Sequence, residues 1–202
     1  MVIRVLIAED QELVRTALAR LVSLEDDITV VAEAADGEET MVLATQVACD
    51  VAVLDIDMPG MDGLITAEKL RVAHPEISVL LLTSHGRPGY LRRGVQAGAR
   101  GFVTKNISGS RLADVIREVH AGGRYLDPEI AADAMFIGEC PLGPRELEIL
   151  RLAEDGRPLA SIAHDLALSE GTVRNYMSAA VTKLGVGNRA GAVRYAQSMG
   201  WL

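Results

Sequence analysis

The chain has 202 residues, a length that fits one large domain or two small ones. Its hydrophobic content of 49% is enough for a packed core, and its two cysteines, Cys49 and Cys140, lack metal-type spacing. No apolar run approaches the roughly 18 residues of a membrane span, and no basic leader followed by an apolar stretch opens the chain. We therefore expect a soluble, cytoplasmic protein with two free thiols.

The net charge of −8 taken alone argues against nucleic-acid binding, but the charge is unevenly distributed. Residues 1–123 hold 12 Lys or Arg against 18 Asp or Glu, whereas residues 141–202 hold 7 against 6. An acidic body with a slightly basic end is a modest indication of a nucleic-acid-binding tail.

The first part of the chain alternates short apolar runs with segments in which apolar residues recur at helical spacing. Five such runs predict strands, at residues 2–8, 28–34, 51–56, 78–83 and 100–104. Each is followed by a predicted helix, and runs such as residues 78–83 are apolar without alternation, which is typical of strands buried on both faces. We therefore predict an α/β domain over residues 1–123, with five βα units and a flavodoxin-like parallel sheet.

After this domain the pattern changes. Residues 124–140 contain Pro128 and Gly138 among several acids and are interpreted as a linker with a helical turn or more. Residues 141–202 read as four helices, the first opened by Gly143-Pro144 and the third capped by Ser169. The second predicted domain is therefore all-α.

Polar side chains stand where the predicted strands end. Glu9 and Asp10 follow the first strand, Asp55 ends the third, Thr83 ends the fourth and Lys105 follows the fifth. In an open parallel sheet these ends share one crevice. Carboxylates gathered there repel one another unless a hard cation such as Mg²⁺ neutralises them. Together with a hydroxyl and an ammonium group, they could hold a phosphoryl group by charge.

These residues resemble the receiver domain of response regulators. The resemblance rests on Glu9-Asp10, Thr83 and two motifs, Asp55-x-x-Met58-Pro59-Gly60-x-x-Gly63 and Gly101-Phe102-x-x-Lys105. It implies that Asp55 is the phosphoacceptor and that Mg²⁺ is the cofactor. The implied metal ligands are Asp55, Asp10, Glu9 through a water molecule, and the backbone carbonyl of Asp57.

The same resemblance implies how the domain switches. Thr83 and Lys105 would bind the phosphoryl oxygens. Thr83 would move toward the added charge, and Phe102 would enter the space that it leaves. The resemblance thus implies a regulator rather than an enzyme.

The C-terminal part is similar to the LuxR-type helix-turn-helix, on the residues from Leu142 to Leu152, Ser169 to Tyr176, and Lys183-Leu184-Gly185-Val186. Together with a receiver, this domain is typical of the NarL/FixJ group of response regulators, whose partner is double-stranded DNA. The third helix has an apolar face that begins at Val173, so its polar stripe faces outward, as in helices that enter a major groove. On this stripe we expect Arg174 and Asn175 to read bases. The remaining expected DNA contacts, mostly to phosphate, are Thr172, Tyr176, Ser178, Lys183 and Arg189. Ser178 stands where many relatives carry a cation, so a contact there is in question.

Four shorter stretches resemble the regulators of membrane-lipid desaturation in Gram-positive bacteria: residues 8–11, 24–27, 87–90 and 172–176. This resemblance implies a membrane sensor histidine kinase as the phosphodonor. The group also implies a homodimer formed on phosphorylation through the first and fifth helices, which offer Leu13, Val14, Leu18, Leu112, Val115 and Val119.

Two other functions were weighed against this one. Asp55-x-Asp57 is also found in enzymes of the haloacid-dehalogenase type, but Glu9-Asp10 and the C-terminal domain would then have no role. A receiver that never accepts phosphate, joined to a constitutive DNA-binding domain, is opposed by the complete set of acidic residues.

Overall fold

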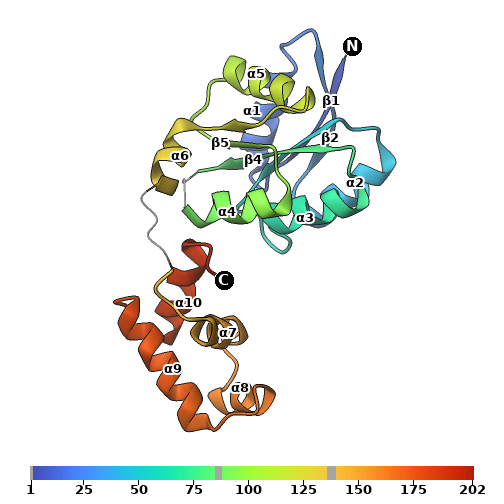
Figure 1. The fold of residues 1–202 in the computed structure, drawn as a ribbon. Coiled ribbons are helices and arrows are strands. Elements are labelled where there is room, and N and C mark those ends of the chain that lie inside the picture. Colours follow the sequence, from blue (N-terminus) through green and yellow to red (C-terminus); the bar gives the residue numbers. More distant parts are fainter. Residues whose placement is uncertain (1, 85–87, 136–139) are drawn as a thin grey trace. The chain divides into compact units, whose positions relative to one another are not determined.

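The computed structural model describes residues 2–84, 88–135 and 140–202. It divides into two compact units (Figure 1). Among the described residues, the first unit comprises 2–84 and 91–135, and the second comprises 88–90 and 140–202.

The first unit is a parallel sheet with the strand order β2-β1-β3-β4-β5-β6. All five predicted strands are present, as β1 (Ile3–Ala8), β2 (Ile28–Ala34), β3 (Val51–Asp55), β4 (Ser78–Thr83) and β5 (Gly101–Thr104). The connecting helices are α1 (Glu12–Val22), α2 (Gly37–Gln46), α3 (Gly63–Ala73), α4 (Pro88–Ala97), which belongs to this unit from Leu91 on, and α5 (Gly109–His120). This is the predicted flavodoxin-like arrangement.

Helices cover both faces of this sheet. Figure 1 shows α1 and α5 on one face and α2, α3 and α4 on the other. Every residue of β3 is buried, and so is every residue of β5. Because both faces of these central strands are covered, their sequences show no polar alternation.

Side chains fix where several helices begin. The Asp36 carboxylate accepts a hydrogen bond from Glu39 N at 2.8 Å at the start of α2, and Asp62 accepts one from Ile65 N at 2.7 Å at the start of α3. Ser108 caps α5 in the same way. These caps satisfy N–H groups that have no partner within the helix.

Two further elements lie in the segment interpreted as a linker. The two-residue strand β6 (Tyr125–Leu126) pairs in parallel with β5, and helix α6 (Pro128–Met135) follows it. The expected helical turn therefore falls in α6, whereas the strand was not predicted, because two residues show no period. The domain limits at 123 and 141 remain predictions, and residues 136–139 lie outside the described residues.

The second unit contains four helices within its described residues, as predicted: α7 (Pro144–Leu152), α8 (Leu159–Asp165), α9 (Glu170–Lys183) and α10 (Arg189–Ser198). They enclose a core that includes Ile149, Ile162 and Val173. Helix α8 begins after Pro158 without a side-chain cap, and Ser169 caps α9 through Thr172 N at 3.0 Å. Among the described residues, no helix is both long enough and apolar enough to cross a membrane.

Candidate functional site

The predicted acidic site forms at the C-terminal edge of the sheet. β1, β3, β4 and β5 are neighbours in the sheet and run parallel, so the residues at their ends come together. Lys105 Nζ lies 2.6 Å from Glu9 Oε2 and 3.0 Å from Asp55 Oδ2. Glu9, Asp10 and Asp55 each offer an oxygen within 4.8 Å of the others.

The three carboxylates differ in exposure. Glu9 and Asp55 are buried, at 0% and 1% exposure, whereas Asp10 is exposed. Burial raises the pKa of Asp55, while its hydrogen bond with Lys105 and one with the Asp57 backbone oppose the shift. Burial likewise raises the pKa of Glu9, against the effect of Lys105. For Lys105, the pairing with these two acids outweighs burial, so its pKa is raised.

One buried carboxylate oxygen of the site has neither a hydrogen bond nor an ion pair within the described residues. Asp55 Oδ1 is buried, and no hydrogen-bond donor within the described residues reaches it. A buried carboxylate oxygen in this condition is costly unless a cation or an incoming group satisfies it. The oxygen donors of Asp55, Glu9 and Asp10 suit Mg²⁺, which binds a few carboxylates and keeps several waters. The residues therefore fit the predicted metal.

Thr83 and Lys105 are held together by the sheet. Thr83 is 1% exposed and is paired in register with Thr104, and Lys105 N donates to Thr83 O at 2.8 Å. The side chain of Asp57, by contrast, is exposed. The role predicted for Asp57, binding of the metal through its backbone carbonyl, stays a prediction.

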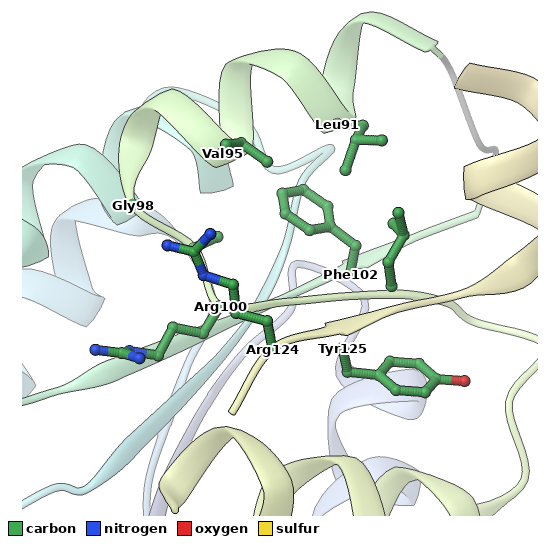
Figure 2. A pocket seen from close by; sticks show the side chains of 9 residues that line it. Leu91, Val95, Gly98, Arg100, Phe102, Arg124 and Tyr125 are labelled. Carbon is green, nitrogen blue, oxygen red and sulfur yellow. The ribbon is translucent and has the colours of Figure 1, made fainter. Parts of the chain in front are cut away.

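Phe102 lies inside the fold, packed against α4. Its side chain is 4% exposed, and a Cβ placed on Gly94 would stand 2.3 Å from Phe102 Cζ. Figure 2 shows the ring directed toward α4, beside a cavity of about 270 Å³ that Leu91 and Val95 of α4 and Tyr125 of β6 also line. The aromatic side chain predicted to switch therefore occupies an inward position that glycine at 94 makes available.

Helix α9 presents the predicted polar stripe. Val173, Met177 and Ala180 are buried in the core of the second unit. Arg174, Asn175, Tyr176, Ser178 and Lys183 are exposed, and Thr172 is half-buried. The helix thus has one apolar and one polar face, as its sequence predicted.

Several of these polar side chains already have partners in the unit. Arg174 pairs with Glu170 at 2.5 Å, one helical turn away. Lys183 Nζ lies 2.8 Å from Glu146 Oε2, which also accepts a hydrogen bond from Gly143 N at 2.7 Å. Arg189 donates to Ala153 O at 3.2 Å. Lys183 and Arg189 therefore connect α9 and α10 to α7 as well as being candidates for DNA contact.

Comparison with known proteins decides the family. Residues 5–117 match the response regulator receiver domain, and residues 140–196 match the bacterial regulatory proteins of the luxR family. The transcriptional regulatory protein YvfU of Bacillus subtilis is 42% identical over 99% of this chain and all of its own length. The chain belongs to the response regulators with a LuxR-type domain.

Other relatives agree with this assignment. The transcriptional regulatory protein DesR of Bacillus subtilis is 38% identical to this response regulator and covers 98% of both chains. The structure of RcsB from Salmonella enterica serovar Typhimurium, bound to promoter DNA in the presence of a phosphomimetic, has a TM-score of 0.71. That structure is 25% identical and covers 97% of this chain and 98% of its own. Because these families are transcriptional regulators, the haloacid-dehalogenase alternative is wrong.

Sequence reasoning missed two features of this response regulator. The contact between Gly94 and Phe102 carries no sequence signal except a glycine in a helix interior, where glycine is otherwise unfavourable. The other is Glu146 in the first turn of α7, which is buried and accepts a hydrogen bond from Gly143 N at 2.7 Å. Its ion pair with Lys183 joins residues 37 positions apart.

Proposed function

We propose that a sensor histidine kinase in the membrane phosphorylates this cytoplasmic response regulator on Asp55, in a reaction that requires Mg²⁺. The observation that carries the proposal is the buried Asp55 Oδ1, which has no donor among the described residues and lies in a cluster with Glu9 and Asp10. In the transfer, the carboxylate oxygen of Asp55 attacks phosphorus, and the P–N bond of the kinase phosphohistidine breaks. Mg²⁺ would neutralise the donor phosphate and the carboxylates when bound.

Each neighbouring side chain has a role in this reaction. Asp10 and Glu9 would hold the metal, Glu9 through water, and the Asp57 carbonyl would complete its ligands. Lys105, now paired with Glu9 and Asp55, would pair with the new phosphoryl oxygens. The Thr83 hydroxyl would donate to one of them, and Phe102 would fill the space that Thr83 vacates.

The test is labelling by a small phosphodonor. Incubation with acetyl phosphate and Mg²⁺, followed by intact mass, is expected to show one added phosphoryl group. EDTA should abolish the label, because the clustered carboxylates repel the anionic donor without the cation. Labelling that persists in Asp55→Asn, or that EDTA leaves unchanged, would overturn the assignment.

We further propose that phosphorylation promotes binding of α9 in the major groove of DNA. The exposed stripe that begins at Arg174 supports this role, with Arg174 and Asn175 reading bases and the other predicted residues positioning the helix on phosphates. RcsB supports it as a relative of the same fold bound to promoter DNA. Arg174 must leave Glu170 to reach a base, which lowers the net gain from that contact.

Phosphorylation would also promote dimerisation. One small domain reads few base pairs, whereas in a dimer the second domain binds DNA in an effectively intramolecular step, which raises the affinity. The apolar residues of α5 that were predicted to form the dimer interface face the sheet instead. Leu112, Val115 and Val119 are buried. On α1, Leu13 is 83% exposed, so it is the stronger candidate for an interface. Light scattering with and without beryllofluoride should show a shift toward the dimer mass. An unchanged mass with increased DNA binding would show that activation does not need a dimer.

A further inference from the structure

Asp127, between β6 and α6, is a buried carboxylate whose polar groups are fully engaged. It is 9% exposed. Its Oδ2 accepts hydrogen bonds from Thr104 N at 3.2 Å and from Thr104 Oγ1 at 3.1 Å. Its Oδ1 accepts one from Glu129 N at 2.9 Å. Its own N–H donates to Phe102 O at 2.9 Å, and its carbonyl accepts from Ala131 N at 2.9 Å.

These bonds join two elements that differ in role. Thr104 is the last residue of β5, whereas Glu129 and Ala131 belong to the first turn of α6. Asp127 thus begins α6 as a capping residue does, and the same carboxylate holds the end of β5. β6 lies beside β5 in the same sheet (Figure 1).

The strand end that Asp127 holds is also the strand end of the candidate site. Thr104 is paired in register with Thr83 and directly precedes Lys105. Phe102, two residues earlier, accepts the backbone hydrogen bond of Asp127. One residue, Asp127, therefore bonds both the end of β5 and the start of α6, through its carboxylate to Thr104 and through its backbone N–H to Phe102.

Breaking this connection is unfavourable because the carboxylate of Asp127 is buried. Within the described part of the chain, Asp127 has no ion-pair partner, so its charge is stabilised by hydrogen bonds alone. A buried charge that loses donors is strongly disfavoured. If the end of β5 moves, Asp127 either loses both bonds to Thr104 or moves together with Thr104. In the second case α6 moves too, because Asp127 caps its first turn.

We propose that Asp127 is a positioning residue that makes α6 follow the end of β5 when the site is phosphorylated. The proposal rests on the proposed function. α6 is the last described element before residues 136–139, so it is placed to pass the change toward the DNA-binding domain.

Hydrogen exchange of the full chain, with and without beryllofluoride and Mg²⁺, tests the proposal. In the wild type, the exchange rates of residues 130–135 should change by about fivefold or more, the lower end of coupling between distinct sites. In Asp127→Ala this ratio should fall to about one, while fluorine NMR still detects bound beryllofluoride. Asp127→Asn should also lose most of the response, because one amide oxygen cannot serve both Thr104 and Glu129.

The matched control is Glu129→Ala, which removes an exposed carboxylate in α6 and keeps the N–H that bonds Asp127. It should respond like the wild type. If α6 of Asp127→Ala is already unprotected, Thr104→Val serves instead, because it removes one bond and leaves the cap of α6 intact; its response should be reduced. A response in Asp127→Ala, Asp127→Asn or Thr104→Val equal to that of the wild type would overturn the coupling alone, and so would the lack of an α6 response in wild type that binds beryllofluoride. Wild type that binds no beryllofluoride would overturn the proposed function, and the coupling with it.

Discussion

Replacing Gly94 of α4 by alanine tests how the side chain of Phe102 in β5 packs against this helix. In an open helix interior, Gly→Ala stabilises a protein by about 1 kcal/mol. At Gly94, however, the new Cβ would stand 2.3 Å from Phe102 Cζ, 2.4 Å from Phe102 Cε1 and 2.8 Å from Leu81 Cδ1. The ring is 4% exposed and Leu81 is fully buried, so neither can move aside without repacking. Overpacking of this kind costs about 1–3 kcal/mol, and contacts this short belong at the upper end.

The expected net effect of Gly94→Ala is therefore a loss of about 2 kcal/mol in the free energy of unfolding of the receiver. Urea denaturation followed by circular dichroism measures it. Gly171→Ala in α9 is the matched control, because its Cβ would lie 3.7 Å from the nearest atom outside its immediate neighbours, so it should stabilise. In a Phe102→Leu background, Gly94→Ala should cost less than it does in the wild type, because its two shortest contacts are with the ring. If Gly94→Ala stabilises the receiver as Gly171→Ala stabilises its own domain, the packing argument is refuted.

Three further predictions concern individual side chains within each unit. The hydrogen bond of Arg4 lowers the pKa of Asp50 to about 2. This pair therefore stabilises the fold at pH values above the ordinary pKa range of Asp, and the stabilisation is lost as the pH falls through about 2. Acid denaturation of Arg4→Gln should lack this loss. Burial raises the pKa of the Cys49 thiol to about 11. N-ethylmaleimide at pH 8 should therefore label the more accessible Cys140 first. Equal labelling of the two cysteines in the native protein, measured by intact mass, would contradict this. Arg174→Ala should cost about 1–3 kcal/mol on specific DNA and little on scrambled DNA, whereas Lys183→Ala should weaken both alike and flatten the salt dependence; equal losses on both DNAs for Arg174→Ala would argue against base reading.

The sequence was sufficient for the sheet and for the acidic cluster. The strands β3 and β4 are almost entirely apolar, and the polar residues of the site end a strand, as Asp55 ends β3, or directly follow one, as Glu9 and Lys105 do. Because parallel strands bring their ends to one edge, Glu9, Asp55 and Lys105 could be placed together without coordinates, and the structure confirms that they meet.

What could not be predicted depends on contacts between distant segments. The bonds of Asp127 to Thr104 join residues 23 positions apart through a strand too short to show a period. The apolar residues of α5 could face the sheet or a partner, and only packing shows that Val115 and Val119 face the sheet. The exposed stripe of α9 was predictable, whereas the pairing of Lys183 with Glu146 was not.

A DNA-binding titration tests together the phosphorylation of Asp55 and the binding of DNA. A DNA site is first selected from a random library by the wild-type protein in acetyl phosphate and Mg²⁺. Affinity for that site is then measured with and without acetyl phosphate, for the wild type and for Asp55→Asn. Acetyl phosphate should tighten binding of the wild type alone. An equal increase in Asp55→Asn, or no increase in a wild type shown by mass to be phosphorylated, would contradict it.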